Sequence, residues 1–143
     1  MGRKSNYRKA LARLTDVGET QPTVTDSYNA MMEWLEGVPW KDMSPEGRER
    51  FMERVVEEAF GLVRKWWLDV IKKNAKRVYP SYIRVWRYIL DTYFDYEKWT
   101  LLVDKYETAR NKLYREIARQ LGLSWRTVRD AFWAARDILG LPR

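Results

Sequence analysis

The amino-acid sequence predicts an all-α protein, in which an N-terminal basic helix-loop-helix arm precedes an antiparallel four-helix bundle. Apolar residues recur at three- and four-residue steps along most of the chain, which is the spacing of one buried helix face. Most Gly and Pro residues fall between these stretches, and no strand-like alternation bounded by turns remains. A chain of 143 residues has the length of about one domain. We assign residues 1–40 to the arm and residues 41–143 to the bundle.

The arm is expected to contain two short helices joined by a loop that holds Gly and Pro. Ser5 can cap the first helix, which extends to about Leu14. Thr23 or Thr25 can cap the second, whose apolar face comprises Tyr28, Met31, Met32 and Leu35. Both helices are too short and too thinly apolar to fold alone, so they must pack on something else.

The bundle is expected to begin with a long helix. Ser44 and Pro45 form an N-cap followed by proline at the first helical position. The apolar stripe behind them predicts one helix of roughly thirty residues, to about Arg77, which ends before Pro80. The stripe comprises Phe51, Met52, Val55, Val56, Ala59, Phe60, Val63, Trp66, Trp67, Val70 and Ile71.

Three further helices complete the predicted bundle. One begins at Pro80, the next is capped by Asp95 and ends at Gly122, and the last is capped by Ser124 and ends at Gly140. The last helix is expected to direct Trp125, Val128, Phe132, Ala135 and Ile138 inward.

The residue types present favour a protein without catalytic activity. His and Cys are both absent, so imidazole and thiolate cannot serve as nucleophile, base or zinc ligand. The chain contains no Gly-rich phosphate loop and no hydrolase or zinc-protease motif. Glu49, Glu53 and Glu57 interleave with arginines, as in ordinary surface pairing along a helix. We therefore predict no enzyme activity, no cofactor, no metal and no small-molecule substrate. No apolar run is long enough to span a membrane, and the basic start lacks the apolar core of a secretory signal.

Positive charge is segregated along the chain. The 27 Lys and Arg exceed the 20 Asp and Glu by seven. Residues 1–14 carry +5 without any acid, from Arg3, Lys4, Arg8, Lys9 and Arg13, whereas residues 15–36 carry −5. Two further basic blocks cover residues 63–88 and 110–143. Blocks of this kind favour a polyanionic partner. The alternative is a set of solvated, charge-rich faces like those of heat-stable proteins.

The stretch Arg115–Ile138 is the most motif-like part of the chain, because it resembles a helix-turn-helix. In this interpretation the second helix would present Arg126, Thr127 and Arg129 to DNA bases. The alternative is a plain turn between two bundle helices, stopped by Gly122 and capped by Ser124. The apolar bulk of the last helix and the lack of a conventional first helix across the pair favour this alternative.

The aromatic residues divide into two groups. Trp66, Trp86 and Trp99 lie on the core stripes. A second group widens the apolar arc beyond what one bundle needs, and exposed aromatics of that kind favour self-association. This group comprises Trp67, Tyr88, Tyr96, Tyr114 and Trp133.

The basic start MGRKSNYRKALARL, the helix-loop-helix through Glu36 and the four helices from Ser44 to Leu139 resemble one known class of protein. They are similar in layout and size to the major capsid proteins of filamentous and rod-shaped archaeal viruses, the lipothrixviruses, tristromaviruses and rudiviruses. The resemblance spans the whole chain but includes no short diagnostic motif.

The resemblance implies a structural nucleoprotein that packages linear double-stranded DNA in a helical virion, assembled in the cytoplasm of a hyperthermophilic host. Its partners would be double-stranded DNA and a second copy or a similar second capsid protein, and contact with a viral envelope stays open. Sequence-independent phosphate contacts would come from Arg3, Lys4, Arg8, Lys9, Arg13, Lys72, Lys73, Lys76 and Arg77. The alternative is a small helix-turn-helix transcriptional regulator that uses residues 115–138.

Overall fold

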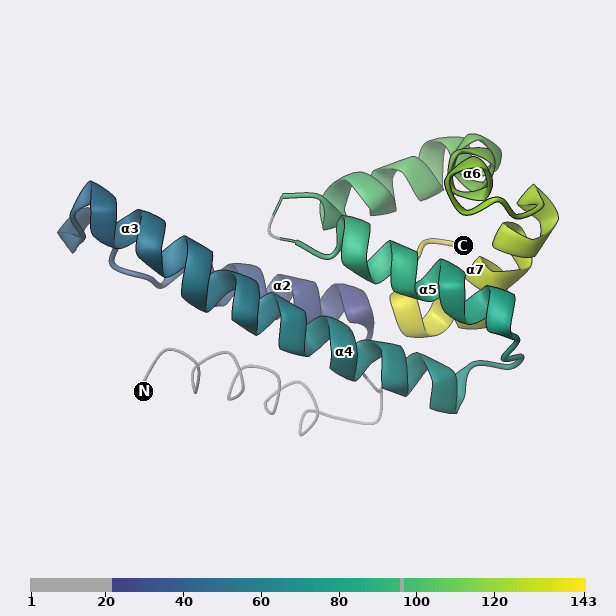
Figure 1. Cartoon of the computed structure of the whole chain (residues 1–143), viewed down its shortest axis with the longest axis horizontal. Helices are drawn as coiled ribbons and strands as arrows, with labels where there is room; N and C mark the ends of the chain where they lie inside the picture. Colours follow the sequence, from purple (N-terminus) through teal and green to yellow (C-terminus); the bar gives the residue numbers. More distant parts are fainter. Residues whose placement is uncertain (1–21, 96) are drawn as a thin grey trace.

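The computed structural model describes residues 22–95 and 97–143, and every regular element within these ranges is a helix (Figure 1). The prediction of an all-α chain is therefore confirmed for the described residues. The first arm helix, with its five basic residues, lies outside them, as does Tyr96. The helices are α2 (Val24–Glu36), α3 (Pro45–Phe51), α4 (Glu57–Asn74), α5 (Pro80–Tyr93), α6 (Trp99–Leu121) and α7 (Trp125–Leu139). A 3-10 turn (Trp40–Asp42) precedes α3, and a π turn (Met52–Val56) joins α3 to α4.

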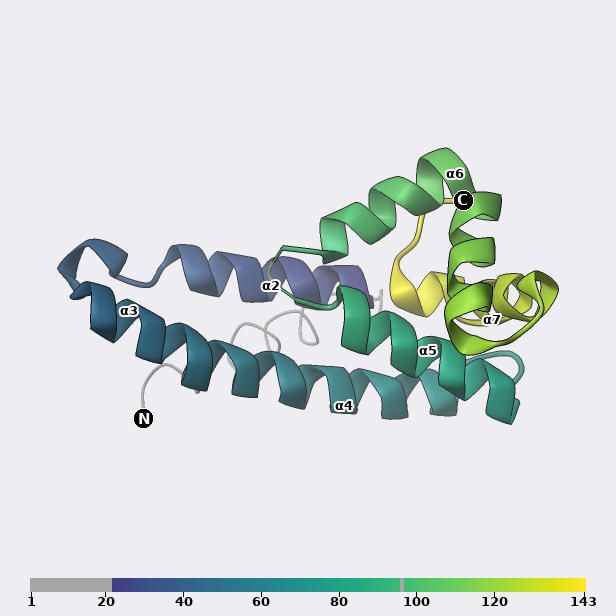
Figure 2. The ribbon, with the colours of Figure 1, turned by 45° about the horizontal axis from the view of Figure 1, so that its top comes forward.

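The segment from α3 to α4 forms one long rod, as the apolar stripe predicts (Figure 2). Ser44 caps it by accepting a hydrogen bond from the Gly47 amide. The rod ends at Asn74 and not at about Arg77, because Ala75 adopts an extended conformation with ψ 144°. Lys76 and Arg77 consequently belong to the loop before α5.

The π turn changes which tryptophan of the rod is buried. It inserts one extra residue, so the buried face passes from Phe51 to Val56 in five steps instead of four. Beyond it the buried positions include Trp67 and Ile71. Trp67 is 1% exposed and Trp66 is 43% exposed, which reverses the predicted assignment of these two side chains.

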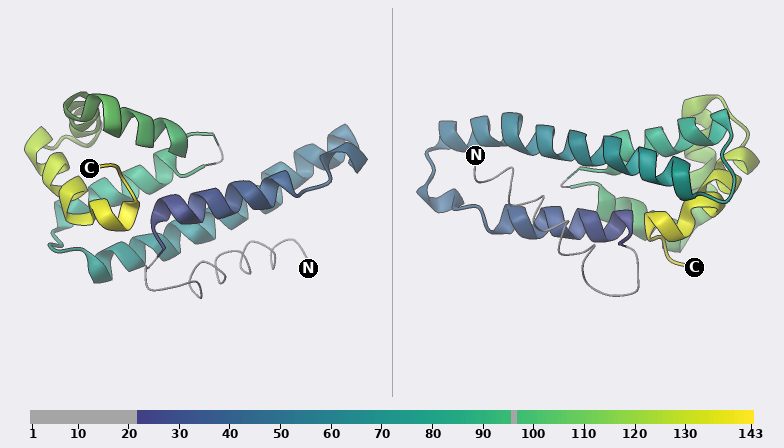
Figure 3. Two further views of the ribbon diagram at one scale, coloured as in Figure 1. Left: turned by 180° about the vertical axis from the view of Figure 1, so that it is seen from behind. Right: turned by 90° about the horizontal axis from the view of Figure 1, so that it is seen from below.

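Helix α2 packs along this rod as part of the hydrophobic core (Figures 2 and 3). The Trp67 indole donates a 2.7 Å hydrogen bond to the Ser27 hydroxyl, and the rings of Trp34 and Phe51 lie 6.0 Å apart. Its N-cap is Thr23, which forms a capping box with Asp26. Through this apolar face, the described part of the predicted arm shares one hydrophobic core with residues 41–143.

Helix α6 begins later than predicted and contains a sharp kink (Figure 1). Asp95 caps the turn before the helix, because its carboxylate accepts hydrogen bonds from the amides of Glu97 and Lys98. At Ala109 the backbone leaves the helical region, with φ −148° and ψ 56°. Arg110 fixes the kink by donating to the Tyr106 and Pro142 carbonyl oxygens, at 3.0 and 3.4 Å. Residues 99–108 and 110–121 therefore run in different directions.

The kink encloses a small aromatic core. The Tyr106 and Tyr114 rings pack against Phe132 of α7, with centroids 5.7 and 5.3 Å away. Tyr114 is buried, contrary to the prediction that it widens a surface arc, whereas Tyr88 is half-buried and Trp133 is exposed. Burial raises the pKa of the Tyr114 phenol, and the adjacent Tyr106 hydroxyl raises it further. Trp86 and Trp99 are core residues, as predicted.

The end of α7 meets the start of α2 (Figure 3). The Thr25 hydroxyl donates to the Leu139 carbonyl oxygen at 2.9 Å and accepts from the Trp99 indole at 3.2 Å. The two ends of the described chain are thereby joined through one hydroxyl. None of the described helices combines the length and apolar character needed to cross a membrane.

Candidate nucleic-acid interface

The turn between α6 and α7 has the geometry that the helix-turn-helix interpretation requires. Gly122 adopts the left-handed conformation, with φ 66° and ψ 33°, and ends α6. The Leu123 amide then donates to the Ala118 carbonyl oxygen at 3.0 Å. Ser124 caps α7 by accepting a 3.2 Å hydrogen bond from the Thr127 amide. The two helices are thus joined by three residues, in a turn fixed at both ends.

Helix α5 packs across the back of this pair, although the sequence predicted no such helix there. The Trp86 indole donates to the Ala131 carbonyl oxygen at 2.9 Å, and Arg84 donates to the Leu121 carbonyl oxygen at 2.8 Å. Val128 and Phe132 of α7 are completely buried. Residues 110–121, α7 and α5 therefore form a three-helix unit. The kink at Ala109 creates this unit by shortening the first helix of the pair.

Three guanidinium groups surround the half-buried ring of Trp125 at the exposed side of the turn. Arg115 of α6 lies 5.8 Å from the ring centroid, and Arg126 and Arg129 of α7 lie 5.7 and 5.3 Å from it. Each cation gains about 0.5–1 kcal/mol from the ring at an exposed site. We call these four residues the Trp125 cluster. An anion between the arginines would relieve their mutual repulsion.

Nearby acids compensate this positive charge only in part. Arg129 pairs with its neighbour Asp130 at 3.1 Å. Glu116 pairs across the kink with Lys105 at 3.6 Å. Both pairs are solvent-accessible and therefore weak. Beside the cluster, a shallow hollow on α6 is lined by Lys112, Arg115, Glu116 and Arg119.

The structure brings together two of the three residues predicted to read DNA. Arg126 and Arg129 lie in the Trp125 cluster, whereas the Thr127 hydroxyl is engaged at 2.8 Å with the hydroxyl of Ser124. No role for Arg115 was predicted from the sequence, and Trp125 was predicted to face inward, whereas its ring is half-buried. The only sequence feature that could have indicated the cluster is the recurrence of Arg on both sides of Trp125 and of the Gly-Leu-Ser turn.

The second predicted phosphate-binding set lies where α4 ends. Lys72 and Lys73 occupy its last turn, Lys76 and Arg77 follow in the loop, and all four side chains are exposed. The Lys76 amide approaches the Ala134 carbonyl oxygen of α7 at 3.5 Å. This basic loop therefore lies beside α7. The five basic residues of the predicted arm fall outside the described ranges.

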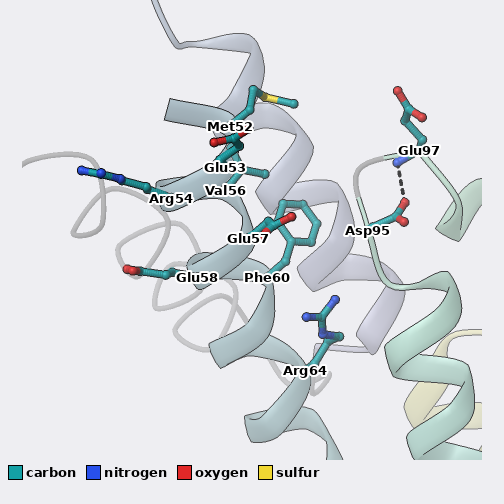
Figure 4. A pocket seen from close by; sticks show the side chains of 10 residues that line it. All are labelled: Met52, Glu53, Arg54, Val56, Glu57, Glu58, Phe60, Arg64, Asp95 and Glu97. Atoms are coloured by element: carbon teal, nitrogen blue, oxygen red, sulfur yellow. Dashed lines mark hydrogen bonds between the residues drawn. The ribbon is translucent and has the colours of Figure 1, made fainter. Parts of the chain in front are cut away.

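A groove among the described residues has the opposite charge (Figure 4). It lies between α4 and the loop before α6, above Phe60. Its acids are Glu53, Glu57, Glu58, Asp95 and Glu97, against Arg54 and Arg64. This groove does not suit a phosphate. Within the described ranges, no group of three or more His, Cys, Asp or Glu is placed to hold a metal ion.

No protein-family model, curated protein or solved structure matches this chain.

Proposed function

We propose that this protein binds double-stranded DNA through the α6–α7 pair, with the N-terminal turn of α7 in the major groove. The observation that carries the proposal is the Trp125 cluster, which gathers Arg115, Arg126 and Arg129 at a helix-turn-helix turn. In DNA-binding proteins with this motif, the first residues of the second helix contact base edges.

The surroundings of α7 support this proposal in two ways. The first turn of α7 contains no acid, so its amides and its arginines present the same sign of charge to a phosphate or a guanine. The buried contacts of Trp86 and Phe132 hold the helix from behind, so its outer face is presented in one fixed orientation. Arg126 and Arg129 would contact bases, and Arg115 would contact the phosphate backbone.

The experiment compares a double substitution in the cluster with a matched pair elsewhere. Duplexes bound by the full chain are first selected from a random library, and affinities are then measured by fluorescence anisotropy. The change Arg126→Ala/Arg129→Ala should weaken binding to a selected duplex by about 10- to 100-fold for each lost base contact. Random duplexes should lose less, so discrimination should fall. The control is Arg50→Ala/Arg54→Ala, which removes two exposed arginines from α3 and the π turn. Equal affinities for the wild-type chain and the cluster variant would refute the proposal.

A second candidate is a coat protein of a filamentous archaeal virus, acting in the virion. Its support is the segregated charge, with +5 over residues 1–14 and four exposed cations around the end of α4. In that proposal residues 1–14 wrap the duplex as an arm, and the helices from Pro45 onward form an antiparallel four-helix bundle that packs against further copies. Contacts would be indifferent to sequence. The two candidates thus differ in whether the selected duplexes share a sequence.

A further inference from the structure

We infer that the loop of residues 75–79, between α4 and α5, is a second DNA contact that touches the duplex on the minor-groove side of the backbone beside α7. The inference rests on the proposed function, because it takes the N-terminal turn of α7 to lie in the major groove. It adds a contact at the minor groove of the DNA, made by residues of the 75–79 loop, to the major-groove contact proposed for α7.

The loop of residues 75–79 lies beside α7. The Lys76 amide lies 3.5 Å from the Ala134 carbonyl oxygen, so the loop flanks α7 eight residues beyond Arg126. Burial raises the pKa of Tyr82, and the Asp130 carboxylate nearby raises it further while Arg77 lowers it. Asp130 of α7 and Arg77 of the loop thus both act on the Tyr82 phenol, in keeping with the loop lying beside α7 at Ala134.

The length of α7 between Arg126 and Ala134 sets how far the loop lies from the proposed base contacts. Eight residues of α-helix rise about 12 Å, which is about the width of the major groove. If Arg126 contacts base edges in the major groove, the loop therefore lies at the sugar-phosphate backbone that borders this groove. Beyond that backbone lies the minor groove. Lys76 and Arg77 are exposed there, and their side chains are long enough to contact the DNA backbone.

The loop combines basic residues with exposed apolar side chains. No acidic residue occurs from residue 70 to residue 90. The loop nevertheless exposes two apolar side chains, Val78 at 43% and Tyr79 at 50%, and Trp133 of α7 is 47% exposed. The Tyr79 ring is held edge-on against Tyr82, with centroids 4.9 Å apart. Basic residues beside an exposed apolar wedge are the combination that minor-groove proteins use.

A second copy of this loop is a poor alternative partner. In a symmetric dimer the same patch meets itself, so Lys76 and Arg77 of one copy would face the same two cations of the other. In DNA, the phosphates pair with the cations, and the sugars and bases offer apolar surface on which Val78 and Tyr79 can pack.

Affinity cleavage can place the loop on DNA, because the chain has no cysteine of its own. The variant Val78→Cys is coupled to an iron–EDTA reagent and bound to a duplex selected by the wild-type chain. Cleavage should occur beside the protected site, with the cut positions on the two strands offset toward their 3′ ends, as attack from the minor groove requires. The control is Lys41→Cys, labelled in the same way in the turn before α3, which should give no localised cleavage.

Salt dependence supplies the second readout. The change Lys76→Ala/Arg77→Ala should lower the slope of log affinity against log salt by about 2, since each phosphate contact contributes about 0.9. The control Lys41→Ala/Arg50→Ala should leave the slope unchanged. If the wild-type chain binds no DNA, the proposed function fails and the inference fails with it. If binding persists and depends on Arg126 and Arg129, the inference alone is overturned by a 5′ offset, by no cleavage from position 78, or by an unchanged slope.

Discussion

Gly122 and Gly140 end α6 and α7 in the same left-handed conformation but in different surroundings. Their φ angles are 66° and 78°, which a side chain disfavours. A Cβ atom at Gly122 would meet nothing within 4 Å. At Gly140 it would lie 2.6 Å from the Thr23 hydroxyl and 2.7 Å from the Thr25 hydroxyl. These hydroxyls cap α2 and join it to α7.

Gly140→Ala should therefore destabilise the protein more than Gly122→Ala. The change at Gly122 should cost about 1–2 kcal/mol, which is the backbone cost of the left-handed conformation. The change at Gly140 adds the displacement of two threonines and the loss of their hydrogen bonds, at about 1 kcal/mol each. Urea denaturation followed by circular dichroism gives both free energies of unfolding. Equal losses would show that the contact between the ends of α2 and α7 contributes nothing to stability.

At the scale of elements, the rod from α3 to α4 shows how one residue can change a buried face. Periodicity alone placed Trp66 and Trp67 on the same stripe, because a regular helix was assumed through Met52–Val56. The π turn shifts the later residues, so only Trp67 reaches the core and bonds to Ser27. No glycine or proline in Met52–Val56 marks this insertion, whereas Phe51 and Trp67 on either side of it both contact α2.

We predict that the rod tolerates loss of a residue within the π turn but not within α4. Deleting the exposed Glu53 would bring Phe51 and Val56 to the four-residue spacing of a regular helix, and the buried face would stay continuous. Deleting the exposed Lys65 would rotate Trp67 and Ile71 away from the core by about 100°. The first variant should unfold within a few degrees of the wild type, and the second should lose its cooperative thermal transition. Similar melting of both deletions would argue against the π turn as an insertion.

At the scale of the whole molecule, caps and stops were easier to predict than packing. Ser44, Ser124, Gly122 and Gly140 act through local hydrogen bonds and φ angles, which residue type dictates, and they stand where the sequence placed them. The burial of α2 and the kink at Ala109 depend on contacts between distant segments, such as that of Arg110 with Pro142. Arg126 and Arg129 could be predicted as neighbours because they lie one turn apart on the same helix. Arg115 lies on α6 and comes close to them only in the folded chain.

The arrangement of charge over the molecule also separates the two proposed functions. A sequence-specific DNA-binding protein needs a local basic surface, which in the proposed function consists of the Trp125 cluster and the loop of residues 75–79. The groove beside Asp95 is lined by acids. A coat must continue along any duplex, so bound mass should grow in proportion to DNA length. We expect instead that one selected site in a 200-base-pair duplex binds a fixed number of copies at moderate salt. Sedimentation velocity gives that number, and electron microscopy of the same samples should show no filaments of regular pitch. Continuous filaments on DNA of unrelated sequence would favour the coat protein and contradict sequence-specific binding. Sequence-independent phosphate contacts alone would then account for the affinity.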